Sequence, residues 1–224
     1  MIVLGLTGSI GMGKSTAASM LRGLGCPVHD ADAAVHALYR QGGAAVPVIA
    51  KLFPSVIRDG AVDRAALGRV VLGDTAAMRR LEAAVHPLVQ QQSRAFLVQQ
   101  ARRGVPLVVM DVPLLFEGGG WKRVDYIAVV TAPPSLQRAR VLARPGMTVE
   151  KFNHILARQM PDVMKRQLAD FVIPTGLGRH FTLQHLQRIV TLLRRQQQGR
   201  IWPPRQRPRF DTPSLARRWK PPHA

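Results

Sequence analysis

The sequence predicts an α/β fold built on a parallel β-sheet, and three observations support this prediction. Several short apolar runs are bounded by turn residues, as buried parallel strands are. Helix-like stretches separate these runs, which is the alternation expected of a parallel sheet. The chain has 224 residues, enough for one compact domain with a smaller insertion and a sizeable core.

The order of the elements predicts where this insertion lies. Five apolar runs are the expected strands: residues 2–6, 27–29, 107–110, 126–130 and 171–173. A first helix is expected over 14–24 and a last one around 183–193, where Leu183, Leu186, Val190 and Leu193 share one face. Three further helices are predicted over 63–72, 75–85 and 88–103, the last begun or kinked by Pro87. Because these three follow one another between strands, they predict an all-helical excursion off the sheet.

The charge balance is strongly basic. There are 32 Lys and Arg against 13 Asp and Glu, a formal net charge of +19, although the 46% hydrophobic composition is ordinary for a globular protein. Such a field attracts phosphates, nucleic acids or anionic surfaces. A net +6 falls in the proline-rich tail 196–224, from Arg200, Arg205, Arg207, Arg209, Arg217, Arg218 and Lys220 against Asp211. We expect this tail to be disordered, with nucleic-acid binding as the alternative.

Cysteine usage and hydropathy bear on the compartment. The single cysteine, Cys26, cannot form an internal disulfide, which favours a reducing environment. No apolar run approaches the roughly 18 residues of a membrane span. We therefore expect a cytoplasmic protein without a membrane partner.

The most specific motif lies between the first strand and the first helix. Residues 8–15, GSIGMGKS, fit G-x-x-x-x-G-K-[ST], the phosphate-binding loop or P-loop. Glycines let successive backbone N–H groups turn inward around phosphate oxygens, and the helix N-terminus adds partial positive charge. The motif predicts a nucleotide site in which Lys14 reaches the β- and γ-phosphates, Ser15 ligates Mg²⁺ and Thr16 contacts the α-phosphate. The backbone of the loop would bind the nucleotide at Gly8, Gly11, Met12 and Gly13. The alternative is a glycine-rich turn with a chance lysine.

A P-loop does not by itself give the reaction. GTPases read guanine with N-K-x-D, but the only asparagine here, Asn153, precedes His154, and no D-x-x-G occurs. A larger ATPase module would need more chain for its sensor elements. These observations favour a compact small-molecule kinase.

Three aspartates are candidates for kinase chemistry. Asp30 and Asp32 follow the second expected strand, where a parallel sheet presents its carboxyl ends to a ligand. Each of these two could act in catalysis or cap a helix, and Asp32 would be an N-cap because a helix is expected to begin there. Asp111 ends the strand 107–110, as a Mg²⁺-binding acid of the Walker-B type would, or as an ordinary strand-ending residue.

Several segments together resemble the dephospho-CoA kinase family, over about residues 1–195. The match rests on 6–16 (LTGSIGMGKST), 30–32 (DAD), 86–87 (HP), 113–117 (PLLFE), 137–144 (QRARVLAR), 159–160 (QM) and 169–173 (ADFVI). The resemblance implies a three-layer P-loop kinase core with a five-stranded parallel sheet over 1–61 and 104–195. It also implies a helical acceptor-binding domain over 62–103 and a small lid over about 138–160.

The implied reaction is ATP-dependent phosphorylation of the ribose 3′-hydroxyl of dephospho-CoA, which gives coenzyme A and ADP in the last step of coenzyme A synthesis. Asp32 matches the acid that serves as base, and it would orient the hydroxyl and accept its proton late. Another nucleoside or nucleotide kinase is the alternative. ATP and Mg²⁺ are the implied cofactors.

The resemblance also implies further site residues. Arg140 would act on the transferring phosphoryl group and Arg144 would bind ATP from the lid, or both lie on a solvated basic helix face. His86 would contact the acceptor or cap a helix kinked at Pro87. Glu117 would lie near the acceptor, or pair with Lys122 or Arg123.

The chain departs from the family pattern after residue 173. An acidic residue and an asparagine are usual there, whereas Pro174, Thr175 and Gly176 follow here. The adenine contact of that asparagine therefore has no direct counterpart.

Overall fold

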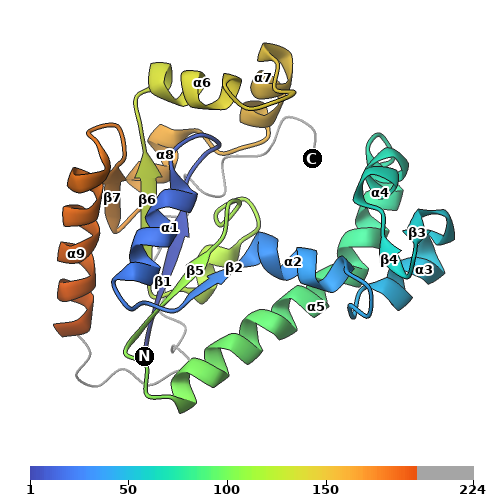
Figure 1. Cartoon of the computed structure of the whole chain (residues 1–224), viewed down its shortest axis with the longest axis horizontal. Helices are drawn as coiled ribbons and strands as arrows, with labels where there is room; N and C mark the ends of the chain where they lie inside the picture. Colours follow the sequence, from blue (N-terminus) through green and yellow to red (C-terminus); the bar gives the residue numbers. More distant parts are fainter. Residues whose placement is uncertain (196–224) are drawn as a thin grey trace. The chain divides into compact units, whose positions relative to one another are not determined.

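The computed structural model describes residues 1–195 (Figure 1). The five expected strands join one sheet in the order β2-β5-β1-β6-β7. The predicted α/β class with a parallel five-stranded sheet is therefore confirmed. The predicted disordered tail, residues 196–224, lies outside the described residues.

The central strands of the sheet are buried along their whole length. They are β1 (Ile2–Thr7) and β5 (Leu107–Asp111), and β1 pairs in parallel with β5 on one side and with β6 (Tyr126–Thr131) on the other. The outer strands are β2 (Val28–Asp30) and β7 (Phe171–Pro174), the latter parallel to β6. Strands buried on both faces need apolar residues at every position, which explains why the sequence shows continuous runs rather than alternation.

Helices and a loop cover the two faces of this sheet. On one face, α1 (Lys14–Gly23) and α9 (Arg179–Arg195) pack Leu21, Leu186 and Val190 against Ile2 and Leu4. On the other, the core contains Ile127 and Val129 together with Leu115, Phe116, Met160 and Leu168. This second core is supplied by the segment after β5, with the short helix η2 (Gly120–Arg123), and by α8 (Asp162–Gln167). Between β6 and α8 the chain forms α6 (Pro134–Leu142) and α7 (Val149–Ala157).

Residues 29–99 form a second compact unit with its own core. It contains α2 (Ala31–Tyr39), α3 (Val46–Leu52), η1 (Pro54–Val56), the hairpin β3 (Ile57–Arg58) and β4 (Ala61–Val62), α4 (Arg64–Val71) and most of α5 (Thr75–Arg102). Leu38, Ile49 and Phe53 pack with Leu67 and Leu81 in its interior. The unit thus begins at residue 29, whereas the sequence predicted an insertion beginning at 62. The short helices α2 and α3 belong to it because their apolar residues are buried by distant partners, a relation that local periodicity does not contain.

The helix start expected at Pro87 is wrong, because α5 is one continuous helix from Thr75 to Arg102, whereas the alternative of a kink at Pro87 stays a prediction. Proline removes one backbone hydrogen bond and usually ends or kinks a helix. Here Val85 is buried in the core of the second unit, and Leu88 and Val89 pack against the same core on the other side of the proline. Tertiary packing on both sides therefore offsets the local cost.

His29, at the start of the second unit, predicts a pH dependence of stability. Burial lowers the pKa of its imidazole, which lies against the Phe96 ring at a centroid distance of 5.2 Å and 3.1 Å from Ser93 Oγ. Below a pH of ~6.5 the unfolded chain then binds a proton that the folded chain does not, so stability falls on acidification. We expect the free energy of unfolding of the wild type, minus that of His29→Gln, to decrease between about pH 7 and pH 5 in urea titrations. A pH-independent difference would contradict this.

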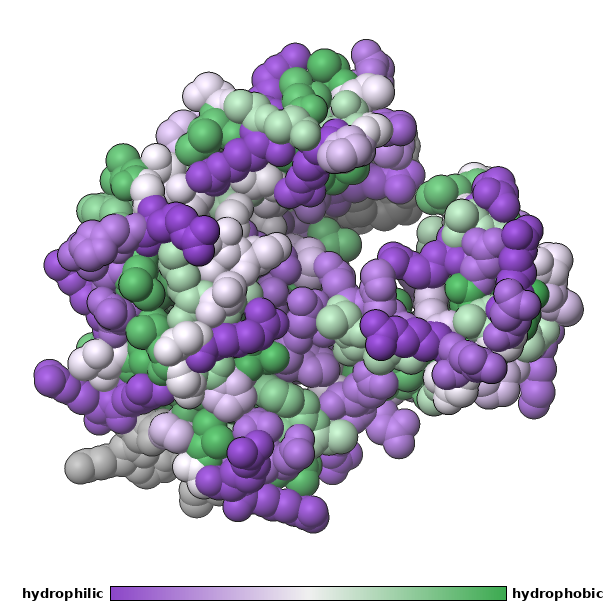
Figure 2. Space-filling model, viewed as in Figure 1, coloured by the Kyte–Doolittle hydropathy of each residue, from purple (hydrophilic) through white to green (hydrophobic). Residues whose placement is uncertain are grey.

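One face of the molecule is mostly polar (Figure 2). On the face shown in Figure 2, hydrophilic residues (purple) surround smaller hydrophobic areas (green). Within residues 1–195, no helix combines the length and apolarity that a membrane crossing requires.

Candidate active site

The P-loop connects β1 to α1, as predicted. Gly11 and Gly13 have φ values of 77° and 86°, in the left-handed region that favours glycine. A Cβ on Gly11 would lie 2.5 Å from Val141 Cγ2, and one on Gly13 would lie 3.1 Å from Thr175 Oγ1. These two positions therefore need glycine both for backbone conformation and for close packing. Ser15 and Thr16 follow in the exposed first turn of α1.

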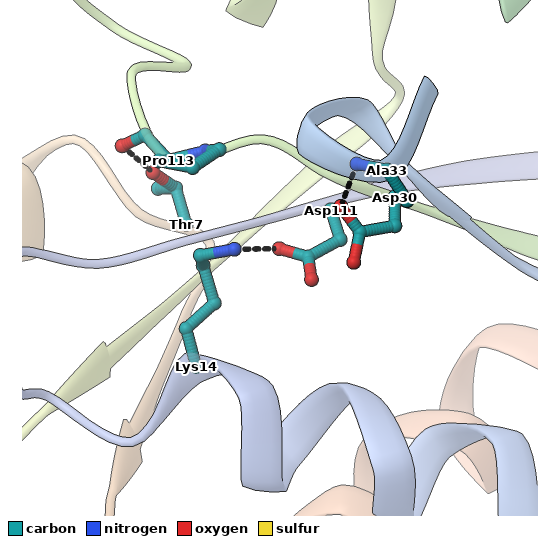
Figure 3. Close-up of polar contacts among 6 residues, drawn as sticks. All are labelled: Thr7, Lys14, Asp30, Ala33, Asp111 and Pro113. Carbon is teal, nitrogen blue, oxygen red and sulfur yellow. Dashed lines mark hydrogen bonds and ion pairs between the residues drawn. The ribbon is translucent and has the colours of Figure 1, made fainter. Parts of the chain in front are cut away.

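Lys14 and Asp111 form an ion pair beside this loop. Lys14 Nζ lies 2.5 Å from Asp111 Oδ1, and the two side chains are only 17% and 3% exposed (Figure 3). The pairing follows from the topology, because β5 lies next to β1 and its carboxyl end faces the start of α1. Thr7 Oγ1 donates a hydrogen bond to the carbonyl oxygen of Pro113 and fixes the chain after β5 (Figure 3). The structure thus places the predicted strand-ending acid directly at the P-loop lysine.

The residues present fit a magnesium ion that is shared with phosphate. Mg²⁺ prefers oxygen ligands and is commonly held by one or two protein groups together with substrate phosphates and water. Ser15 offers an exposed hydroxyl and Asp111 a carboxylate. No cluster of three or more His, Cys, Asp or Glu that could hold a metal occurs within residues 1–195. These donors therefore suit a nucleotide-bound ion rather than an all-protein metal cage.

Side chains from three other segments hold the outside of the P-loop. Gln137 of α6 donates to the carbonyl oxygen of Ile10 at 2.7 Å, and Gln159 accepts from the Ile10 N–H at 3.0 Å. Thr175, after β7, donates to the carbonyl oxygen of Met12 at 2.8 Å. Together these contacts fix the path of the loop.

Arg140, predicted to act on the transferring phosphoryl group, is hydrogen-bonded to the protein. Its guanidinium donates to the Thr175 carbonyl at 2.8 Å and to Thr175 Oγ1 at 3.1 Å, with a longer contact of 3.5 Å to the Gly11 carbonyl. The alternative of a solvated helix face is therefore wrong for Arg140. Arg144 lies just beyond α6 and is exposed, so its contact with ATP stays a prediction. The predicted lid boundary at 138 falls inside α6, which is tied to the P-loop.

The two aspartates at the start of the second unit occupy different positions in α2. Asp30 is the N-cap of α2, because its Oδ1 accepts from the Ala33 N–H at 3.0 Å (Figure 3). Asp32 lies in the first turn of that helix, so the alternative of an N-cap at Asp32 is wrong. Its side chain is exposed and makes no hydrogen bond or ion pair with the residues that the structure describes. A base that must meet a substrate hydroxyl needs such an accessible carboxylate.

Glu117 has a different partner from those expected. Its Oε1 lies 2.9 Å from Lys165 Nζ and accepts from the Met160 N–H at 2.8 Å. The Lys165 side chain is fully buried and that of Glu117 is 10% exposed. Pairing with Lys122 or Arg123 is therefore wrong. The carboxylate joins the loop after β5 to α8, and its contact with the acceptor stays a prediction.

His86 lies within α5 and not at a helix end. The side chain is exposed, and one ring nitrogen lies 2.8 Å from Gln90 Nε2, one turn further on. Capping of a kinked helix is therefore wrong for His86, because the helix continues. Its contact with the acceptor stays a prediction.

In each of the two units, sequence reasoning missed residues that hold other side chains or loops in place. Thr175 and Gln137 hold the P-loop, and Lys165 neutralises Glu117. In the second unit, Arg64 Nη1 of α4 lies 2.5 Å from His36 Nε2 of α2, one turn from Asp32. No local signal could have found these pairs, because the partners are far apart in the chain.

Comparisons with known proteins agree on one family. The sequence model of the dephospho-CoA kinase family (CoaE) matches residues 2–177. The chain is 56% identical over 196 residues to the dephospho-CoA kinase of Mesorhizobium japonicum, covering 88% of this chain and 98% of that protein. It is 60% identical over 194 residues to that of Paramagnetospirillum magneticum, covering 87% and 92%.

Solved structures share the fold. TT1252 from Thermus thermophilus superposes with a TM-score of 0.74 at 36% identity, over 85% of this chain and 96% of that one. The dephospho-CoA kinase from Campylobacter jejuni gives 0.60 at 20% identity, over 85% and 96%, and supports the fold alone. With a P-loop lysine held by a strand-ending aspartate and a family match over most of its length, the chain belongs to the dephospho-CoA kinase family.

Proposed function

We propose that this protein transfers the γ-phosphoryl group of ATP to the ribose 3′-hydroxyl of dephospho-CoA, giving coenzyme A and ADP. The observation that carries the proposal is the P-loop with its Lys14–Asp111 pair, in a chain whose relatives bear the name dephospho-CoA kinase. A reducing cytoplasm suits the single buried thiol of Cys26.

The residues of the first unit bind and neutralise the nucleotide. Backbone N–H groups of the P-loop and the N-terminus of α1 face the phosphates, and Lys14 contributes a positive charge beside them. Ser15 and Asp111 would hold Mg²⁺, which when bound neutralises charge on the phosphate oxygens. Arg144 would add a further cation from the segment after α6.

Asp32 orients the acceptor. The 3′-hydroxyl is far less acidic than a carboxylic acid, so Asp32 accepts a hydrogen bond from it first and takes its proton late in the transfer. Its exposed position in the first turn of α2 leaves the carboxylate accessible for this contact.

The acceptor's diphosphate has a cationic partner near Asp32. Asp32 and His36 lie four residues apart on the exposed face of α2, and Arg64 contacts His36 from α4. No carboxylate forms an ion pair with Arg64 among residues 1–195. A ribose 3′-hydroxyl at Asp32 would place the 5′-diphosphate about one helical turn away, within reach of this pair.

Arg64→Ala is expected to raise the KM for dephospho-CoA about 10-fold or more, because a charge-assisted hydrogen bond contributes ~1.5–3 kcal/mol. The KM for ATP should stay unchanged. Steady-state kinetics measure both constants, and Arg69→Ala, on the exposed side of the same helix, is the control. Equal effects of the two substitutions would contradict a diphosphate contact at Arg64.

The function itself is tested with purified protein, ATP, Mg²⁺ and either dephospho-CoA or a panel of nucleosides and nucleotides. ADP formation coupled to NADH oxidation reports turnover, and mass spectrometry identifies the phosphorylated product. We expect turnover with dephospho-CoA and a gain of one phosphoryl group at the ribose. Turnover with a nucleoside or nucleotide but not with dephospho-CoA would favour the alternative kinase.

A further inference from the structure

Three successive carbonyl groups of the P-loop point toward side chains of other segments. The carbonyl oxygen of Ile10 accepts from Gln137 at 2.7 Å, that of Gly11 lies 3.5 Å from Arg140 Nη1, and that of Met12 accepts from Thr175 at 2.8 Å. Gln137 and Thr175 are only 6% and 8% exposed. The loop is therefore held from its outer side by buried donors.

This arrangement sets the direction of the N–H groups. In a planar trans peptide the C=O and the following N–H point to opposite sides. Because the Met12 carbonyl is held toward Thr175, the Gly13 N–H points to the opposite, inner side of the loop. In the same way, the Ile10 carbonyl held by Gln137 turns the Gly11 N–H inward. Neither N–H has a hydrogen-bond partner within residues 1–195, whereas the Met12 N–H donates to the Ser9 carbonyl at 3.2 Å. The inward N–H groups are the donors that a phosphate needs.

Thr175 is the centre of these contacts. Its hydroxyl lies 2.8 Å from the Met12 carbonyl and 3.2 Å from the Thr131 carbonyl, and it accepts from Arg140 Nη1 at 3.1 Å. Having one proton, the hydroxyl donates it over the shorter distance, to Met12. The Thr175 backbone is fixed as well, since its N–H donates to the Thr131 carbonyl and its own carbonyl accepts from Arg140. Few degrees of freedom remain for the hydroxyl.

We propose that Thr175 is a positioning residue for ATP, which aligns the Gly13 N–H with the phosphates through the Met12 carbonyl. Arg140 orients Thr175 in this arrangement. The inference rests on the proposed nucleotide-binding role of the P-loop. It also gives a role to the departure at residues 174–176, where Thr175 follows the sheet in place of the usual acidic residue and asparagine.

Three substitutions test this role. Thr175→Val keeps the shape of the side chain and removes the hydroxyl, which leaves the Met12 carbonyl without its donor. Thr175→Ser restores the hydroxyl. Thr182→Val is the matched control, because Thr182 is 3% exposed and its hydroxyl also donates to backbone carbonyls, those of Pro174 and Gly178, but does not touch the P-loop.

For Thr175→Val we expect the Kd of ADP and the KM of ATP to rise about 5- to 30-fold, as the loss of one buried hydrogen bond implies. The KM for dephospho-CoA should stay within about twofold, and Tm should fall no further than in Thr182→Val. Thr175→Ser should restore most of the nucleotide affinity. Isothermal titration with ADP, steady-state kinetics and thermal unfolding give these values for the full chain.

Two outcomes would overturn the proposal. One is nucleotide affinity in Thr175→Val equal to that of the wild type. The other is the same loss of affinity in Thr182→Val, which would show a general structural effect. Because ADP titration does not depend on the acceptor, it decides the role of Thr175 even if the wild type fails to phosphorylate dephospho-CoA.

Discussion

Asp32→Asn is expected to lower kcat by about 10²- to 10⁴-fold, the usual contribution of a positioned general base. The amide retains the size of the side chain but cannot accept the proton of the 3′-hydroxyl. Because Asp32 belongs to the second unit and the P-loop to the first, the Kd of ADP should stay within about twofold of the wild-type value. Steady-state kinetics with ATP and dephospho-CoA, together with ADP titration, measure the two effects separately.

Asp30→Asn is the matched control for this prediction. It removes the same charge two residues away, and the asparagine still caps α2 as a side-chain acceptor for the Ala33 N–H. We expect kcat within about threefold of the wild type, since a cap exchanged for a similar cap costs little. Near-normal turnover in Asp32→Asn would rule out its role as base, and a large loss in Asp30→Asn would transfer that role to Asp30.

Lys165→Met is expected to lower the free energy of unfolding by about 3–5 kcal/mol. Lys165 is fully buried and its Nζ lies 2.9 Å from Glu117 Oε1, so methionine fills similar space but leaves a carboxylate without its cation in the core beside β6. Urea denaturation followed by circular dichroism and tryptophan fluorescence gives the change.

The double variant Lys165→Met/Glu117→Gln shows whether the unpaired charge is the cause. Glutamine is neutral and keeps an acceptor for the Met160 N–H, so we expect the double variant to be more stable than Lys165→Met alone. Exchanging the exposed pair Arg166 and Asp162 in the same way should change stability by no more than about 1 kcal/mol. A loss below that value in Lys165→Met would contradict a stabilising role for the buried pair.

Much of the sheet could be predicted because its information is local. Continuous apolar runs such as the one in β1 identify strands buried on both faces, and the glycines before Lys14 identify a strand–loop–helix unit. The nucleotide site could be predicted from that unit. The residue types of a P-loop are set by its backbone geometry, by the N–H groups that bind phosphate oxygens and by the lysine that neutralises their charge. The position of Asp111 at the end of a strand was also local information.

The role of each charged side chain depended on the tertiary structure. Arg140 belongs to a basic segment whose sequence suits a lid, yet its guanidinium is hydrogen-bonded to Thr175, 35 residues away. Glu117 belongs to a loop with two nearby cations, yet pairs with Lys165 on α8. In both cases the local sequence suits more than one environment for the charged group, and only tertiary packing selects the partner.

By itself, the sequence determined that this protein has a parallel α/β fold with a P-loop, and it indicated the dephospho-CoA kinase family through the spacing of short motifs. The tertiary structure alone decided that α5 runs through Pro87 and that the second unit begins at residue 29. It also decided that Thr175 supports the phosphate loop. The physical reason is the sequence distance over which the interactions act. Backbone conformation and strand burial depend on a few neighbouring residues. The buried partners of a proline-containing helix, a lysine or a carbonyl group come from segments that are distant in the sequence and meet only in the folded chain.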